Sequence, residues 1–346
     1  MKCNREMLGW AMVTWLLIPV FPSFSQSVER ESSATVKEDS DKPVNSARLK
    51  RPVLWHDPGN IAELNLYFGQ GGKSGTPVSP FKFESEDASG TNPKFNLRDA
   101  NGTKWRVKLG DEARPEVTAS RLLWAVGYFV DDDYSLDADV KDLKLTRGAD
   151  LAADGHIVDA RFEKKPDGEK KIGIWRWKDN PFTGSKEFNG LRVMMAVMNN
   201  WDLKDVNNGV YEDSKSGREL FLVADVGATF GTNGLSWSKG RSRGDVHTFE
   251  HSKFIKRKTD AEVDFGTPAP PTPIEAPNVK QYAMRRDLAW IGKSIPISDA
   301  RWMGSLLMQL SHQQLVDAFR AGQFPPEEIE KYVAVVEGRI QELAEL

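Results

Sequence analysis

The sequence predicts an α+β fold with a strand-rich N-terminal part, residues 53–135, and a mainly helical C-terminal part, residues 136–346. Three observations support this prediction. Aromatic and branched residues alternate with charged ones between 53 and 109, as in half-buried strands. From residue 116 onward, apolar residues recur at helical spacing. A proline-rich segment, 266–277, predicts a stiff connector before the last helices.

The composition excludes several classes of protein. With 39 % hydrophobic and 28 % charged residues among 346, the chain is too polar for a protein with many membrane spans. Its eleven tryptophans and seventeen phenylalanines argue against disorder, because they supply the apolar surface of a core. Basic residues number 47 and acidic residues 50, so no positive field attracts nucleic acid or anionic lipid. We therefore expect no nucleic-acid partner.

The first residues predict a secretory signal, residues 1–25. Lys2 and Arg5 precede an apolar stretch of about 14 residues, and small residues follow it near the expected cleavage site. We therefore expect export to the periplasm or the cell exterior, with no integral membrane association after cleavage. The alternative is an uncleaved anchor, although a membrane span needs about 20 apolar residues.

The expected mature chain contains no cysteine, because Cys3 lies within the signal and no other cysteine follows. Disulfides, cysteine-ligated zinc and a cysteine nucleophile are therefore excluded from it. Residues 26–52 are polar, charged and free of aromatic side chains, so they predict a disordered linker. The folded part is expected to begin at about residue 53.

Alternation predicts the strands of the N-terminal part. Phe81 and Phe83 alternate with charged residues in one strand. Residues 95–99 and 104–109 are expected to form a hairpin, because the dipeptide Asn101-Gly102 between them is typical of hairpin turns. A helix is expected to follow over 116–126 and to end at Gly127.

Helical periodicity dominates the C-terminal part. Leu191, Met194, Met195 and Met198 share one face, and a core role is favoured over metal binding for this methionine-rich stripe. Residues 208–213 and 219–224 are expected to pair as a hairpin. Two helices are expected to close the chain. Ser311 and Gln314 resemble a capping box before the first, and the second opens at Pro325-Pro326.

The first segment with candidate chemistry begins at Ser89-Gly90. Gly90 lets the backbone turn tightly, so that successive amides can face an anion; an ordinary turn is the alternative. The second pairs Lys108 with Glu116. A strand lysine can hold phosphate oxygens, and a helical carboxylate can hold the ammonium in place. The alternative for Lys108 is a solvated strand face, because Lys104 shares its side of the strand.

The third segment is 200–208, which follows the methionine-rich helix. Asp202 can orient or deprotonate a hydroxyl, Lys204 can neutralise a transferred phosphoryl group, and Asn207 can offer its amide oxygen to a metal. In the fourth segment, an apolar strand ends at Asp225. A carboxylate beside an amide oxygen is a set of hard oxygen ligands suited to magnesium.

Together these segments resemble a kinase. Asp202-Leu203-Lys204-Asp205-Val206-Asn207 resembles the catalytic loop of protein kinases, and Asp225-Val226-Gly227 resembles their metal-binding Asp-Phe-Gly loop. The segment from Ser89 to Lys94, followed by a strand, a turn and Trp-x-x-Lys, is similar to HipA-like kinases. These kinases share the atypical kinase fold with phosphoinositide kinases. The resemblance spans roughly 89–231.

The resemblance implies a bilobal protein-kinase-like fold that binds ATP between its lobes. It assigns Ser89, Gly90, Lys108 and Glu116 to nucleotide binding, and Asn207 and Asp225 to Mg²⁺. It assigns Asp202 and Lys204 to transfer of the γ-phosphate to a hydroxyl of a protein or small molecule. Catalysis in this class depends mainly on positioning and charge neutralisation.

Two departures keep other functions open. Asn200-Trp201 replaces the usual His-Arg before the catalytic aspartate, and Val226 replaces phenylalanine. A pseudokinase that binds nucleotide without turnover is therefore an alternative. An unrelated extracytoplasmic binding or structural protein, with coincidental motifs, is another.

Four other features have simpler explanations. The glycine-rich stretch 69–75 is interpreted as a linker rather than a second phosphate loop, because it lacks the Walker spacing. Asp131-Asp132-Asp133 is interpreted as a solvated run. His247 and His251 share a helix face but have no evident third zinc ligand. Basic residues in 229–253 either bind an acidic substrate or are simply solvated.

Overall fold

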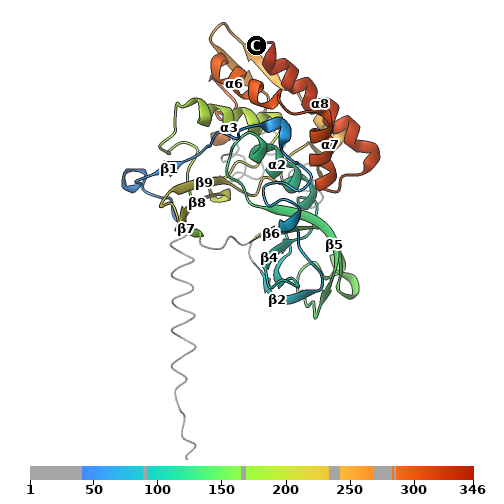
Figure 1. Ribbon diagram of the computed structural model, residues 1–346. Helices are drawn as coiled ribbons and strands as arrows, with labels where there is room; N and C mark the ends of the chain where they lie inside the picture. Colours follow the sequence, from blue (N-terminus) through green and yellow to red (C-terminus); the bar gives the residue numbers. More distant parts are fainter. Residues whose placement is uncertain (1–40, 89–91, 165–168, 234–241, 269–282, 284–285) are drawn as a thin grey trace, which may run out of the picture. The chain divides into compact units, whose positions relative to one another are not determined.

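The computed structural model describes residues 41–88, 92–164, 169–233, 242–268, 283 and 286–346. The predicted signal, 1–25, most of the predicted linker, and the residues Ser89 and Gly90 lie outside these ranges. Ser40–Leu346 forms one compact unit. Its fold is α+β, with strands concentrated in the N-terminal part and helices in the C-terminal part (Figure 1).

Five strands close into a barrel in the order β2-β3-β4-β6-β5. They are β2 (Phe81–Asp87), β3 (Lys94–Arg98), β4 (Lys104–Lys108), β5 (Asp133–Lys141) and β6 (His156–Lys164). All neighbours are antiparallel except β2 and β5, which pair in parallel. Short 3₁₀ turns, η4 (Ala149–Leu151) and η5 (Ala153–Gly155), lie between β5 and β6. The predicted boundary at residue 135 falls inside β5. Because β5 and β6 both belong to the barrel, the strand-rich part extends to Lys164.

The predicted hairpin around Asn101-Gly102 is confirmed. Strands β3 and β4 pair in antiparallel register, and Gly102 has the positive φ, +79°, that favours glycine in such turns. The Asp99 carboxylate accepts hydrogen bonds from the turn amides of Asn101 and Thr103. Inward-facing aromatic and branched side chains fill the barrel: Phe95, Leu97, Trp105, Val107 and Phe162 are all buried.

Residues 41–80 correct two expectations. The prediction of a disordered linker up to residue 52 is wrong over 41–52, which pack onto the fold. The Val44 amide donates to the Ile174 carbonyl, and the amides of Lys50 and Arg51 donate to the Glu219 carboxylate. The expectation of strands from residue 53 onward is wrong over residues 54–80, which form no strand and only one isolated β-bridge, between Trp55 and Tyr128. The ordered elements of 41–80 are β1 (Pro52–Val53) and three 3₁₀ turns, η1 (Ser46–Arg48), η2 (Ile61–Glu63) and η3 (Lys73–Gly75).

Helix α2 (Ala113–Ala125) packs against the barrel strands β5 and β6 and against α7. It begins three residues before the predicted start at Glu116, and Gly127 (φ +93°) follows its end as expected. A second sheet has the order β1-β9-β8-β7, with β7 (Glu169–Gly173), β8 (Asn208–Asp213) and β9 (Glu219–Val223). The predicted hairpin of β8 and β9 is confirmed.

The methionine stripe lies in α3 (Lys186–Val197) and its cap, and all four stripe residues are fully buried. A short sheet, β12-β13-β14, follows α4 (Val246–Glu250). Its strands are Ile255–Lys258, Glu262–Phe265 and Ile295–Pro296, while Thr232–Asn233 (β10) pairs with Ser242–Arg243 (β11).

Three helices close the chain, one more than predicted: α6 (Ile297–Leu307), α7 (His312–Ala321) and α8 (Pro326–Ala344) (Figure 1). The Ser311–Gln314 capping box is present. Apolar residues of all three helices join the core that contains α2 and α3, so they complete the helical part. None of the helices in the described ranges is both long and apolar enough to cross a bilayer.

Candidate functional site

A buried lysine lies at the end of β4 among three carboxylates. Lys108 is 2 % exposed, and its Nζ lies 2.7 Å from Glu112, 2.9 Å from Glu116 and 2.7 Å from Asp225. Glu112 and Glu116 come from the start of α2, whereas Asp225 follows β9, more than a hundred residues later in the chain. The fold therefore brings the predicted lysine, its helical glutamate and the predicted metal ligand into direct contact.

The strand register explains why Lys108 differs from its neighbours. Trp105 and Val107 point into the barrel, so Lys104, Arg106 and Lys108 share its outer face. Lys104 is exposed and Arg106 is half-buried, as the solvated-face alternative requires. Lys108 alone is covered, because Glu112 at the N-cap of α2 and Glu116 in its first turn lie over it. The solvated alternative is therefore wrong for Lys108.

Arg161 is a site residue that the sequence did not reveal. It pairs with Lys108 across β4 and β6, is 4 % exposed, and donates from Nη1 to the Glu116 carboxylate at 2.6 Å. Glu116 thus bridges two cations on adjacent strands. Arg161 Nη1 also lies 3.6 Å from the buried Asp133 carboxylate. No local pattern marks Arg161, because only the pairing of β4 with β6 places it beside Lys108.

The cluster shifts the acidities of its members. Burial alone would lower the pKa of Lys108, but the negative charges of Glu116, Asp225 and Glu112 together raise it well above its ordinary value. Burial likewise opposes ionisation of Asp225, but the Lys108 charge and hydrogen bond outweigh it and hold the pKa of Asp225 at about 2. Both groups are therefore charged at neutral pH. The predicted roles of Lys108 in phosphate binding and of Asp225 in metal binding require these charges.

The segment that carries Asp225 is tightly built. Asp225 adopts the left-handed conformation (φ +51°), which aspartate tolerates better than most residues. Gly227 approaches the start of α2 so closely that a Cβ would lie 2.6 Å from the Glu112 carbonyl oxygen. Any larger residue at Gly227 would push this segment away from Glu112, so the glycine fixes how Asp225 meets Lys108.

The loop after α3 presents the other candidate residues. The Asn200 side chain accepts from the Asp202 amide, Lys204 Nζ lies 2.8 Å from the Asp202 carboxylate, and Asn207 Nδ2 donates to the Asp202 carbonyl. Leu203 anchors the loop in the core. The loop ends in η6 (Asp205–Asn207). Buried Asn200 thus supports the loop through the Asp202 amide.

Two contacts join this loop to the Asp225 segment. The Trp201 amide donates to the Ala228 carbonyl at 3.3 Å. Asn208 pairs with Val223 across β8 and β9, so Asn207 and Asp225 flank the same end of this hairpin. Burial raises the pKa of Asp202, and the charge of Asp225 adds to the rise. The four residues on which the prediction depended, Lys108, Asp202, Asn207 and Asp225, therefore lie in one region.

Asp225 and Asn207 are the candidate donors for a metal ion. The Asp225 side chain is 44 % exposed, and only one of its oxygens is engaged by Lys108. The Asn207 hydrogen bond uses the amide nitrogen, and no donor to its Oδ1 is found among the described residues. A carboxylate and an amide oxygen at one hairpin end are the hard oxygen ligands that Mg²⁺ prefers.

Ser89 and Gly90 of the predicted phosphate loop lie outside the described residues, whereas residues 92–94 on its C-terminal side are described. On that side, the Leu109 amide donates to the Pro93 carbonyl, and the Asn92 side chain donates to the Glu112 carboxylate. Glu112, also missed from the sequence, therefore contacts both the end of this loop and Lys108. Only its four-residue spacing from Lys108 offered a sequence signal.

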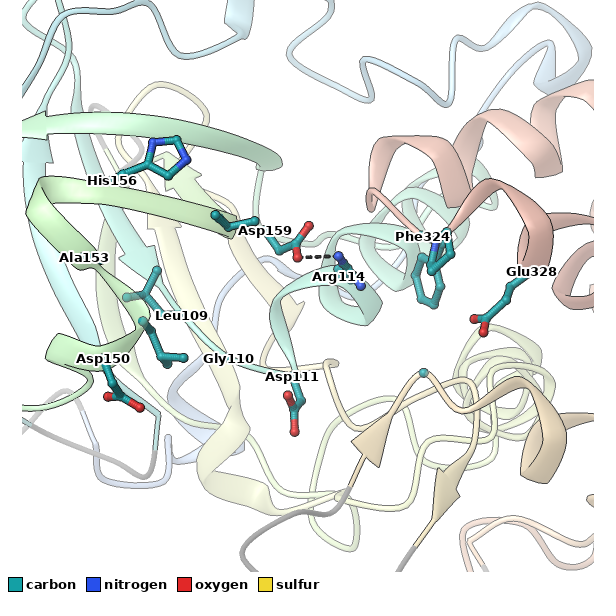
Figure 2. A pocket seen from close by; sticks show the side chains of 14 residues that line it. Leu109, Gly110, Asp111, Arg114, Asp150, Ala153, His156, Asp159, Phe324 and Glu328 are labelled. Atoms are coloured by element: carbon teal, nitrogen blue, oxygen red, sulfur yellow. Dashed lines mark hydrogen bonds and ion pairs between the residues drawn. The ribbon is translucent and has the colours of Figure 1, made fainter.

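A pocket of about 610 Å³ adjoins the residues after Lys108 (Figure 2). Arg114 of α2 and Asp159 of β6 face each other as an ion pair on its wall, as Figure 2 shows. Three further carboxylates line it, Asp111, Asp150 and Glu328, together with the imidazole of His156. None of the residues predicted from the sequence lines this pocket, so it is not the predicted nucleotide site.

Two simpler explanations of the sequence are corrected. The stretch 69–75 is no free linker, because a Cβ at Gly69 would clash with the Arg121 side chain and one at Gly71 with Tyr134. Asp131-Asp132-Asp133 is no solvated run either. Asp133 is 1 % exposed, accepts from Ser120 and belongs to the Arg161 cluster, and burial raises its pKa.

Comparison with known proteins found a distant likeness to a solved structure. A scan against protein-family models and a search of curated proteins each found no match. Among solved structures, the chain is similar to a Helicobacter pylori proinflammatory kinase, CtkA. The sequence identity is 10 %, the TM-score is 0.41, and the match covers 78 % of this chain and 96 % of that one. Because the TM-score is so low, we base neither fold nor function on this likeness.

Proposed function

We propose that this protein is a HipA-like atypical kinase that transfers the γ-phosphate of Mg-ATP to a hydroxyl of a protein or small molecule. One observation carries the proposal: Lys108 contacts Glu116 and Asp225 directly, beside the loop that holds Asp202 and Asn207. Three motifs distant in sequence, those of Lys108, Asp202 and Asp225, would not be expected to meet if their resemblance to a kinase were coincidental. We therefore prefer this proposal to an unrelated binding or structural protein.

Each residue has a role in this proposal. Lys108, held by Glu116, would bind the α- and β-phosphates, with Ser89 and Gly90 supplying backbone amides. Asn207 and Asp225 would hold magnesium, which neutralises phosphate charge when bound. Asp202 would orient the acceptor hydroxyl, because its raised pKa favours accepting a proton. Lys204, at 2.8 Å from Asp202, would offset charge on the transferred group.

The proposal extends to architecture and location. The barrel with α2 would be the N-lobe of a bilobal kinase-like fold, and the helices α3 and α6–α8 would build the C-lobe. The N-terminal sequence 1–25 supports an exported protein, periplasmic or extracellular. In that location, the enzyme would depend on ATP outside the cytosol.

A second function, nucleotide binding without turnover, is favoured by two contacts. Lys204 engages the Asp202 carboxylate that would otherwise receive the acceptor hydroxyl. Glu112 adds a third carboxylate to Lys108, where a phosphate would bind. If ATP does not displace these contacts, the protein would act as a pseudokinase.

The test has two stages. Thermal shift with Mg-ATP measures nucleotide binding, and transfer of labelled γ-phosphate to the protein itself or to general acceptors measures catalysis. We expect Asp202→Ala to abolish transfer but keep the nucleotide-induced shift, and Asp225→Asn to remove the magnesium dependence of the shift. The matched control is Asp260→Ala, which removes an exposed carboxylate with no side-chain partner among the described residues.

The outcomes separate the hypotheses. Binding without transfer by the wild-type protein would favour the pseudokinase. Transfer that survives Asp202→Ala would remove Asp202 from the mechanism. No shift at millimolar Mg-ATP, with a correctly folded protein, would refute both functions.

A further inference from the structure

Two histidines and a glutamate lie together on the exposed side of α4. His247, Glu250 and His251 are all exposed, and one ligand atom of each lies within 4.8 Å of the others. Their i, i+3, i+4 spacing places them on one face of the turn. The two imidazole rings are 4.3 Å apart between centroids. Glu250 is thus a third candidate metal ligand beside the two histidines, and the sequence alone did not reveal it.

The hydrogen bonding of His251 prepares it as a ligand. Its Nδ1 lies 2.7 Å from the His247 carbonyl oxygen. Because a carbonyl oxygen can only accept, Nδ1 must carry the proton, which leaves the lone pair on Nε2. A backbone carbonyl that fixes the ring and its tautomer in this way is the usual support for a metal-binding histidine.

The opposite side of α4 is firmly anchored. Phe249 is fully buried, and the Arg339 guanidinium lies 4.2 Å from its ring centre. The Asp245 side chain caps the helix by accepting from the Thr248 amide. The three exposed groups therefore stand on a turn whose backbone is held in place. No hydrogen bond or ion pair of the Glu250 carboxylate is found among the described residues.

We propose that His247, Glu250 and His251 form a binding site for a divalent transition metal, with Zn²⁺ as the best candidate. Two imidazole nitrogens and one carboxylate oxygen are the protein donors of many open zinc sites, in which water completes the coordination. Calcium and magnesium are disfavoured, because both prefer all-oxygen ligands. Ligand atoms within 4.8 Å need only small side-chain rotations to approach zinc at about 2.1 Å.

The metal would hold the end of the segment that begins at Asp225. Phe230 packs against Phe249 at 5.6 Å between ring centres. Gly231 lies so close to α4 that a Cβ would be 2.1 Å from the Asp245 carbonyl oxygen. A metal that ties His247, the second residue of α4, to the C-cap residue His251 would therefore stabilise the surface on which this segment rests. The proposed site does not depend on the kinase proposal.

Isothermal titration of the whole chain, free of any affinity tag, with zinc chloride tests the site. We expect one equivalent of zinc with a Kd below about 10 µM. His247→Ala and His251→Ala should each weaken binding at least about tenfold. Glu250→Gln should weaken it by a smaller factor. The matched control is His156→Ala, an exposed histidine that pairs with a single carboxylate and should leave zinc affinity unchanged.

A second measurement separates a lost ligand from a lost fold. All three side chains are exposed, so the unfolding temperature of each variant in EDTA should match that of the wild type. Zinc should raise the unfolding temperature of the wild type and of His156→Ala, but not of His247→Ala. No saturable zinc binding by the wild type at 100 µM, or unchanged affinity in His247→Ala, would overturn the proposal.

Discussion

Replacing Lys108 by methionine is the sharpest test of the charge cluster. Methionine keeps a long apolar stem and removes only the ammonium. Lys108 contacts Glu112, Glu116 and Asp225 within 2.9 Å, so the change leaves all three carboxylates without this cation. Glu116, which is 2 % exposed, would then depend on Arg161 alone at 2.6 Å.

The expected loss of stability is about 3 kcal/mol, the lower end of the range for breaking a buried ion pair. The lower end applies for two reasons. Arg161 continues to neutralise Glu116, and Asp225, with its side chain 44 % exposed, can be hydrated when Lys108 is gone. The Glu112 side chain is 11 % exposed, so its hydration after the loss of Lys108 lies between that of Glu116 and that of Asp225.

Urea unfolding at pH 7, followed by tryptophan fluorescence, measures the loss. The matched control is Lys104→Met, on the same face of the same strand but exposed and without a partner among the described residues. We expect this control to change the free energy of unfolding by less than about 0.5 kcal/mol. The double variant with Glu116→Gln should be less destabilised than the sum of its single variants by about 1–2 kcal/mol.

The pH dependence adds a second signature. The folded pKa of Asp225, about 2, lies below its ordinary value of 3.8, so its stabilisation is present above about pH 4 and is lost as the pH falls towards 2. Lys108→Met has no such contribution to lose. The difference between the two proteins should therefore shrink between pH 4 and pH 2. Strict additivity in the double variant, or a difference that grows in acid, would refute the reasoning.

Two further substitutions test how the C-terminal helices support the site. Ser311→Ala removes the capping box of α7 and should lower the free energy of unfolding in urea by about 1 kcal/mol. The control is Ser305→Ala, at a serine within α6 that caps no helix. An equal loss of stability in this control would contradict the explanation. Arg339→Met removes the donors to the Ala196 and Val197 carbonyls at the end of α3 and should cost about 3 kcal/mol, and a loss below 1 kcal/mol would show that water replaces them.

Local structure was largely predictable from the sequence, because its causes are local. The alternation around Trp105, the Asn101-Gly102 turn and the Ser311 capping box each depend on residues a few positions apart. The order of Lys108, Asp202 and Asp225 along the chain was also readable as a set of motifs. None of these signals required knowledge of which strands pair.

The tertiary structure alone decided which polar residues share a site. Lys104 and Lys108 are equivalent in the alternation of β4, yet only Lys108 is buried, because α2 folds over that end of the strand. Arg161 reaches Glu116 only because β6 pairs with β4. A sequence pattern states which side of a strand a residue occupies, but burial of a charge depends on what packs against that side from far along the chain.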